Sequence, residues 1–215
     1  EWGRQKDQRG RRWGAGRAAE SAMRIVLVPL AQPDGRIRCR IKNLLGGNQD
    51  DLYYYGQGVL KESGEILRWP ACKRMQPLPL SKMSHLGGYY NDAGVNIQHD
   101  DFFSVDMAPE TRALLDLVRE ETPDCFMTLH SCEEGPFFTG PDSLIPQAYQ
   151  YRQAEIAAVV GERHRREGLK PETNRVAKPG PRGGFYLHTA LHNACGALPL
   201  LVELPHGLAD KPFTF

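Results

Sequence analysis

A histidine and a glutamate each end an apolar run of the sequence, and both residue types do chemistry. His130 closes the run over residues 124–130, and Glu203 lies near the end of residues 198–204. In an α/β sheet, ligands bind at the carboxyl ends of the strands, so polar side chains there are placed for chemistry. A histidine is a candidate metal ligand and a glutamate a candidate general base. The two residues therefore predict one reactive site.

Apolar runs and helical patterns indicate the elements that must position these two residues. Residues 23–30 are a continuous apolar run rich in branched side chains, which is typical of a buried central strand. Pro109 opens a predicted helix that leads into a strand at residues 125–130. A longer helix is predicted over residues 146–167, and a short one over residues 185–194. We therefore expect an α/β fold with a mixed, mostly parallel central sheet flanked by helices.

The stretch between the first two of these strands has a different character. Residues 32–35 (QPDG) have the composition of a tight turn, because proline fixes φ and glycine accepts a positive φ. Residues 36–103 show no sustained helical period and contain several prolines and glycine pairs. Long irregular regions inside a domain usually shape binding surfaces. We therefore expect residues 36–103 to form much of the wall of the site.

Composition narrows the class of protein. The 215 residues suffice for one sizeable domain, and 40% hydrophobic with 25% charged residues is ordinary for a soluble protein. A formal net charge of +1 gives no reason to expect nucleic acid as a partner. No apolar run reaches the length of a membrane span, so we expect no membrane partner. Five cysteines without paired spacing favour reduced thiols and a cytoplasmic location.

Four landmarks, in order along the chain, resemble the zinc carboxypeptidase family, which includes carboxypeptidase A-like enzymes and the succinylglutamate desuccinylase group. The family's strand followed by Asn-Pro-Asp-Gly is similar to residues 26–35, and its Gly-Val-Asp-x-Asn-Arg-Asn-Phe segment to residues 94–102 (GVNIQHDDF). Its strand ending in His-Ser looks like residues 129–131, and its last strand, with the essential glutamate, looks like residues 201–204. The match covers roughly residues 23–207, and order with spacing is more specific than any one motif.

The resemblance implies a zinc-dependent hydrolase that cleaves a peptide or amide bond in a peptide or acylated amino acid. His130 would be the third zinc ligand, and Glu203 the general base and acid. Zinc held by two histidines and one glutamate keeps a position open for water and lowers the pKa of that water. A nearby carboxylate takes the water proton and returns it to the leaving amine. The structural alternative is a strand-end histidine and a glutamate in a helix cap or salt bridge.

The first departure from the family pattern concerns the metal. The family takes two zinc ligands from an upstream His-x-x-Glu motif, and residues 1–22 contain no histidine. Residues 130–133 match its letters but stand at the third-ligand position, so Glu133 is interpreted as a residue that supports the site. We therefore expect a fragment of such a domain, incomplete at its N-terminus. The alternative is a non-catalytic binding module on the same fold that has lost the metal site.

The second departure concerns the carboxylate of the substrate. The family holds it with an Asn-Arg pair, because arginine offers a bidentate and permanently charged fork. Gln98 and His99 stand at those positions, and we expect them to contact the substrate. Arg74 is also a candidate for the family's carbonyl-polarising arginine, and Tyr186 for its mobile pocket tyrosine. Three cations are candidates to replace the lost arginine: Arg68, Lys73 and Arg74.

Two other constellations support competing interpretations. His188 and His192 are four residues apart and would share one face of a helix, but Thr189 stands where zincins need a glutamate. A structural metal site at these two histidines is one alternative. Cys132, two residues after His130, suggests a thiol nucleophile, but no third residue orients that pair.

The two ends of the sequence resemble cuts through a larger domain. Residues 1–22 hold six basic and three acidic residues with little apolar content. We expect a disordered or non-native basic leader there, with a nucleic-acid-binding arm as the alternative. Residues 23–215 are then expected to form a partial zinc carboxypeptidase-like catalytic domain.

Overall fold

The structure of the protein is a computed structural model. It describes residues 22–39, 47–68, 71–73, 77–132, 137–138, 142, 144–168 and 185–205. The chain divides into two units, Glu1–Ala31 and Gln32–Phe215, and the second unit contains the elements that concern the site. The predicted leader therefore lies, apart from Ala22, outside the described residues.

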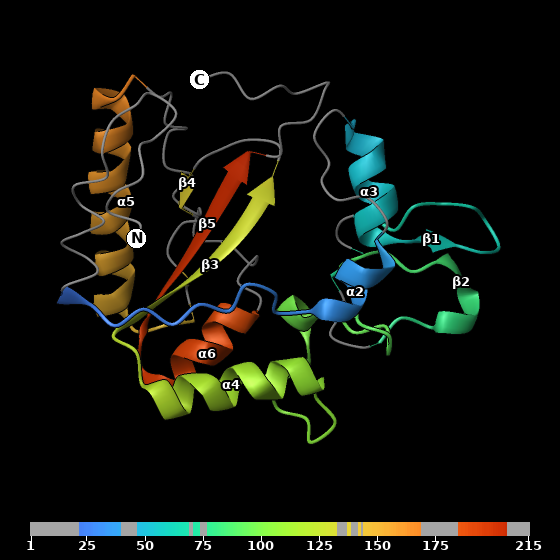
Figure 1. The fold of residues 1–215 in the computed structure, drawn as a ribbon, viewed down its shortest axis with the longest axis horizontal. Helices are drawn as coiled ribbons and strands as arrows, with labels where there is room; N and C mark the ends of the chain where they lie inside the picture. The colour runs from blue at the N-terminus through green and yellow to red at the C-terminus, as the bar shows by residue number, and fades with distance from the viewer. Residues whose placement is uncertain are drawn as a thin grey trace. The chain divides into compact units, whose positions relative to one another are not determined.

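The main sheet of the second unit has three strands among the described residues, in the order β3–β5–β4. β3 (Cys125–Cys132) and β5 (Leu198–Pro205) are parallel, whereas β4 (Phe137–Phe138) pairs antiparallel with β5. Figure 1 shows β3 and β5 side by side. The unit is thus mixed α/β, with a small parallel strand pair flanked by helices. The strands predicted at both chemical residues are confirmed.

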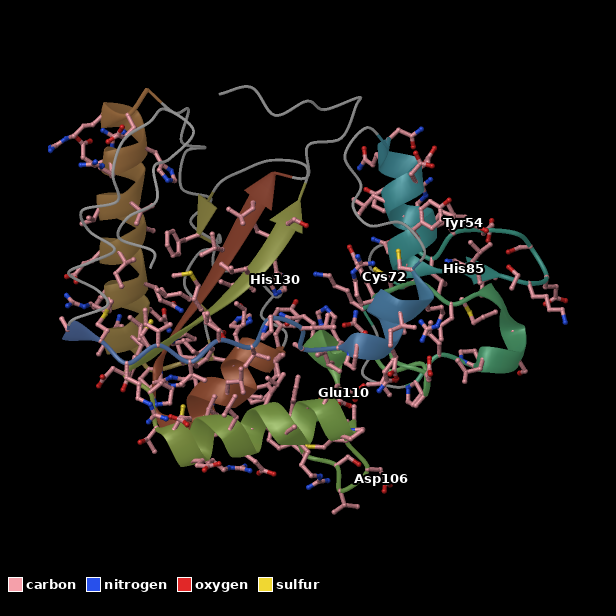
Figure 2. All side chains as sticks on the ribbon, in the orientation of Figure 1. Tyr54, Cys72, His85, Asp106, Glu110 and His130 are labelled. Carbon is pink, nitrogen blue, oxygen red and sulfur yellow. The ribbon has the colours of Figure 1, made fainter. Side chains whose placement is uncertain are left out.

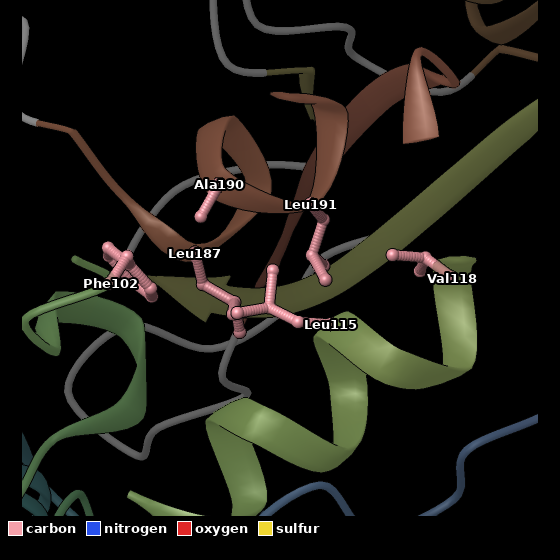
Figure 3. Packing of buried hydrophobic residues seen from close by; sticks show 6 residues of the cluster. All are labelled: Phe102, Leu115, Val118, Leu187, Ala190 and Leu191. Carbon is pink, nitrogen blue, oxygen red and sulfur yellow. The ribbon is translucent and has the colours of Figure 1, made fainter. Parts of the chain in front are cut away.

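Two helices pack on each other beside this strand pair. α4 (Pro109–Glu121) begins at Pro109 as predicted, and α6 (Leu187–Cys195) ends at Gly196 in the left-handed conformation. Their apolar faces meet in the apolar cluster of Figure 3, and α6 also packs on β5. The buried members of the apolar cluster are Phe102, Leu115, Val118, Leu187, Ala190 and Leu191.

A further helix beside the sheet, α5 (Gln147–Arg166), confirms the helix predicted over residues 146–167. It is joined to the sheet by a polar contact, because the buried Gln153 amide donates to the Pro199 carbonyl (2.6 Å) on β5. None of the helices in the described part of the chain is long and apolar enough to cross a membrane.

The prediction of a central strand over residues 23–30 is wrong. The structure assigns no strand to them, and their apolar side chains are largely exposed, Leu27 at 68% and Ile25 at 57%. A strand requires a partner for its backbone N–H and C=O groups, and apolar branched residues do not by themselves provide one. The pattern of residues 23–30 therefore indicates apolar composition but does not predict that the segment pairs with another strand.

Two local predictions that follow in the sequence are also wrong. Residues 32–35 do not form a tight turn but begin α2 (Pro33–Arg38), where Gln32 Oε1 accepts from the Gly35 N–H (2.8 Å). α3 (Gln49–Gln57) is a helix within residues 36–103, which were interpreted as irregular because they show no sustained helical period. A capping box of Asn48 and Asp51 starts α3, so the helix signal lies in the cap and not in an apolar period.

Two short strands and a 3-10 turn follow α3 in the sequence. β1 (Val59–Leu60) pairs antiparallel with β2 (Met83–His85), which follows the 3-10 turn η2 (Leu80–Lys82). Leu67, Cys72, Leu78 and Tyr90 form a second buried cluster, in which the Tyr90 hydroxyl donates to the Cys72 carbonyl (2.9 Å).

Residue 94 of this segment must be glycine. Gly94 has a φ of +79°, and a β-carbon there would lie 3.0 Å from the Leu78 carbonyl oxygen. The chain then enters the 3-10 turn η3 (Ile97–His99), which carries His99 into the interior. The conformation of the backbone thus explains the glycine at the start of residues 94–102.

Candidate functional site

The two residues predicted to do the chemistry are direct neighbours in the sheet. His130 on β3 is the register partner of Glu203 on β5. Register partners on adjacent parallel strands project their side chains on the same face, because side chains alternate between faces along each strand. His130 and Glu203 therefore lie side by side on one face, as the sequence predicted for a shared site.

Glu203 has a buried carboxyl oxygen without a partner. Its Oε2 is inaccessible to solvent and accepts no hydrogen bond from the described residues. Burial raises the pKa of the Glu203 carboxyl, and the nearby Lys73 ammonium opposes this rise only in part. A half-buried carboxyl group with a raised pKa is suited to take up and release a proton.

Four further side chains lie near this pair, because Lys73 influences the pKa of His130 and of Glu203, His188 that of His130, and His130 that of His99. The Tyr186 ring lies edge-on to the His99 ring, with centroids 4.9 Å apart, and Lys73 Nζ lies 5.7 Å from the centroid of the Tyr186 ring. The centroid of the His188 ring lies 5.8 Å from the centroid of the same Tyr186 ring. We call these six residues the site cluster: Lys73, His99, His130, Tyr186, His188 and Glu203. Figure 2 shows His130 on β3 and labels Cys72, the residue before Lys73.

Two histidines of the site cluster, His99 and His130, are held in the neutral state. Burial, with the neighbouring His188 and Lys73, lowers the pKa of His130 to about 4. Burial lowers the pKa of His99 to about 3, and Lys73, His130 and His188 add to this effect. A histidine with such a pKa is uncharged near neutral pH. His99 therefore differs from the arginine of the family, which is a permanent cation.

His188 is positioned by an acidic partner that the sequence did not suggest. Its Nε2 lies 3.5 Å from Asp142 Oδ2, and both side chains are buried. The Thr189 hydroxyl donates to the same oxygen, and the Leu144 N–H donates to Asp142 Oδ1 (2.9 Å). Burial acts to raise the pKa of Asp142, but these hydrogen bonds together outweigh it and lower the pKa.

The other candidate residues have different outcomes. Gln98 is half-buried in η3, and within the described residues no hydrogen bond joins its side chain to the site cluster. Arg68 pairs with Asp50 (2.8 Å) and lies over the Tyr53 ring, so it is committed elsewhere. Lys73 is thus the candidate cation that the structure places in the site cluster. Three predicted residues have side chains that lie outside the description: Arg74, Cys132 and Glu133.

Zinc is the group that the resemblance implies, and the described side chains do not supply its ligands. A catalytic zinc site uses three protein ligands and leaves one position open. Among the described residues, no group of three or more His, Cys, Asp or Glu side chains is placed to hold a metal ion. His130 offers one ligand only. The described part of the site cluster therefore does not fit zinc.

The alternative of a metal held by His188 and His192 is likewise not supported. The two histidines are buried on α6, but they have separate partners. His192 Nδ1 lies 2.8 Å from the Ala197 carbonyl oxygen, and its ring lies edge-on to Tyr149, with centroids 4.7 Å apart. His188 instead faces Asp142. The helical spacing of the two residues was predicted correctly, but the metal role does not follow from it.

Asp142 and the role of His188 were missed because nothing local in the sequence marks them. The two residues are far apart in the chain and meet only because α6 brings His188 back beside Asp142. Comparison of this chain with protein-family models, with curated proteins and with solved structures finds no match. The function therefore has to be inferred from the site cluster itself.

Proposed function

We propose that the site cluster belongs to a hydrolase that cleaves a peptide or amide bond, with Glu203 as the general base and acid. The observation that supports this most is the register pairing of His130 with Glu203 on adjacent parallel strands. The buried Glu203 Oε2 adds to it, because it has no hydrogen-bond partner among the described residues and a group kept for structure alone is normally hydrogen-bonded. The proposed substrate is a peptide or an acylated amino acid.

Glu203 would move one proton in this reaction. The ionised carboxylate accepts a proton from a water molecule as the water oxygen bonds to the carbonyl carbon of the substrate. The carbon–nitrogen bond then breaks, and Glu203 gives the proton to the leaving nitrogen. The raised pKa of Glu203 favours both the uptake and the release of the proton, because general acid–base catalysis is most efficient when the pKa of the group lies nearer the working pH.

The domain that we propose is zinc carboxypeptidase-like, with a mostly parallel sheet, and in that family zinc supplies Lewis-acid chemistry at the substrate carbonyl. We assign zinc no step here, because the described side chains do not supply its ligands. His130 is the described residue that this resemblance assigns to the metal. Full occupation requires ligands beyond the described residues. The roles proposed for Glu203, Lys73 and Tyr186 belong to the protein side chains themselves.

Lys73 is the residue that we propose for the charged end of the substrate. His99 is buried and neutral, so it can contact a carboxylate only as an uncharged donor. Lys73 lies against the Tyr186 ring and lowers the pKa of both His99 and His130, which indicates a positive potential across the site cluster. Gln98, His99, Tyr186 and Arg74 remain proposed contacts of the substrate.

The proposal is tested by hydrolysis of N-benzoyl-glycyl-phenylalanine by the purified protein in zinc-containing buffer. We expect the wild type to release phenylalanine and Glu203→Gln to lose at least about 10³-fold in rate, because the amide cannot take up the proton. Glu155→Gln is the matched control, since Glu155 is an exposed residue of α5 paired with Arg152. Equal rates for wild type and Glu203→Gln would remove Glu203 from the chemistry.

A second candidate is a non-catalytic binding module on the same fold. Two observations favour it: the described residues offer no complete set of metal ligands, and neutral His99 stands where an arginine would anchor a carboxylate. In that case neither the wild type nor Glu203→Gln would release phenylalanine, while both would bind the peptide in calorimetry. Binding without cleavage by the zinc-supplied wild type would therefore select the binding module.

A further inference from the structure

We propose that His188 contacts the bound substrate, and that its Nδ1 accepts a hydrogen bond from a substrate N–H or O–H group. This inference rests on the proposed function, because it concerns the same site cluster. His188 is only 8% exposed on α6, and its Nδ1 is buried without a hydrogen-bond partner in the described part of the chain. Buried polar atoms of native proteins are normally paired, so an exception indicates a partner that arrives with a ligand.

The role of Nδ1 as an acceptor follows from the other side of the ring. His188 Nε2 lies 3.5 Å from Asp142 Oδ2, and an ionised carboxylate can only accept. In the form of the imidazole that carries one proton, this contact holds the proton on Nε2 and leaves Nδ1 with a free lone pair. Two more donors, the Thr189 hydroxyl and the Leu144 N–H, keep the carboxylate of Asp142 in place.

The position of His188 connects this lone pair to the site cluster. The His188 ring borders Tyr186 at 5.8 Å between centroids, and Tyr186 in turn contacts His99 at 4.9 Å. Lys73 Nζ lies 5.7 Å from the centroid of the same Tyr186 ring. A substrate held by Lys73 and Tyr186 would therefore lie next to His188.

His192 shows what a structural histidine looks like on the same helix. It is buried one turn after His188, and its Nδ1 lies 2.8 Å from the Ala197 carbonyl oxygen. Its ring also packs edge-on against Tyr149. The two histidines thus lie on the same helix and are both buried, but within the described residues only the Nδ1 of His192 has a partner. This difference makes His192 the matched control for any test of His188.

The chemistry of a bare imidazole nitrogen defines the class of group that it selects. It accepts a hydrogen bond from a hydroxyl or an amide N–H group and forms none with a methyl group of the same size. Sites built to pair with a substrate donor discriminate strongly against the analogue that lacks it. We therefore infer a preference for substrates with a polar, uncharged donor.

The preference is tested with two near-isosteric probes, N-benzoyl-glycyl-threonine and N-benzoyl-glycyl-valine, in which a hydroxyl replaces a methyl group. We expect the wild type to bind the threonine peptide about tenfold more tightly in calorimetry. His188→Phe should bind both peptides equally, and His192→Phe should keep the wild-type ratio. Equal affinities in the wild type, no binding of either peptide, or an unchanged ratio in His188→Phe would overturn the inference.

A second measurement does not depend on His188→Phe folding. Long-range proton–nitrogen NMR of protein labelled with ¹⁵N-histidine should show His188 protonated on Nε2, and the threonine peptide should shift its Nδ1 resonance. In Asp142→Asn, the Leu144 N–H needs the remaining oxygen, so the new amide NH₂ faces His188 and should move the proton to Nδ1. An Nδ1-protonated His188 in the wild type would overturn the inference.

These outcomes separate the inference from the proposed function. Cleavage of both peptides at equal rates, with equal affinities, would reject the role of His188 and leave the hydrolase standing. Tighter binding of the threonine peptide without cleavage of either would support the role of His188 and count against the hydrolase.

Discussion

The apolar cluster between α4 and α6 and the site cluster at β3 and β5 follow opposite rules. In the apolar cluster, six buried hydrophobic residues pack on one another. In the site cluster, buried polar atoms such as Glu203 Oε2 and His188 Nδ1 lack partners among the described residues. The first region lowers the free energy of the fold, and the second raises it. The second arrangement is a reason to look for a role other than folding.

α6 belongs to both regions and joins them. Leu187, Ala190 and Leu191 fill the apolar cluster, while His188 and Thr189 on the same helix face Asp142. The apolar packing therefore fixes the position from which His188 meets the site cluster. Variants in the two regions should consequently move different observables, stability in one and ligand chemistry in the other.

The largest effect on stability should come from the apolar cluster. Leu115→Ala removes a fully buried side chain that packs between α4 and α6. We expect a loss of about 3 kcal/mol in the free energy of unfolding, measured by urea denaturation, because the variant leaves a cavity. Val105→Ala, at a residue that is 85% exposed, is the control and should change it by less than about 0.5 kcal/mol. Similar losses in the two variants would mean that this cluster is not a core.

The next effect is acid sensitivity that originates in the site cluster. Because the pKa of His99 is about 3 in the folded state, the unfolded chain binds a proton below about pH 6.5 that the folded chain refuses. Stability attributable to His99 should therefore be intact above that pH and fall as the pH drops toward the folded value. Between pH 7 and 5 we expect His99→Phe to reduce the loss of unfolding free energy by about 1–2 kcal/mol.

This pH experiment has a clear negative outcome. Urea denaturation of both proteins at the two pH values gives the difference directly, and the phenylalanine keeps a ring against Tyr186. An identical loss in wild type and His99→Phe would show that His99 is not buried in the neutral state. The site cluster would then lose its contrast with the apolar cluster.

The smallest effect should come from the exposed ion pairs of α5, which belong to neither region. Arg152 and Glu155 are 2.9 Å apart, with side chains that are 68% and 63% exposed. Such pairs are screened by solvent, so Glu155→Gln should unfold within about 0.5 kcal/mol of the wild type. A loss above 1 kcal/mol in urea denaturation would mean that α5 depends on its surface charges.

The sequence predicted the parts of this molecule that have a local signal. Pro109 marked the start of α4, and the apolar runs before His130 and Glu203 marked β3 and β5. The same kind of run at residues 23–30 misled, because apolar composition by itself predicts neither burial nor strand pairing. α3 was missed because the sequence marks it by a helix cap at Asn48 and not by a periodic pattern of apolar residues.

The candidate site divides in the same way. The pairing of His130 with Glu203 was predictable from two strand ends, because parallel neighbours align their carboxyl ends. The contact between Asp142 and His188 was not, since it depends on how a loop residue and α6 meet in space. The neutral state of His99 also required the structure, because burial is a tertiary property.

The most direct test of the account is the stability of Glu203→Gln in urea at pH 7. Burial raises the pKa of Glu203, so the folded state holds this proton to a higher pH than the unfolded chain, and ionisation above that pH costs stability. We predict that the neutral amide raises the unfolding free energy by about 1 kcal/mol while hydrolysis is lost. A variant that is less stable than the wild type and still hydrolyses the peptide would contradict the claim that Glu203 is buried for chemistry.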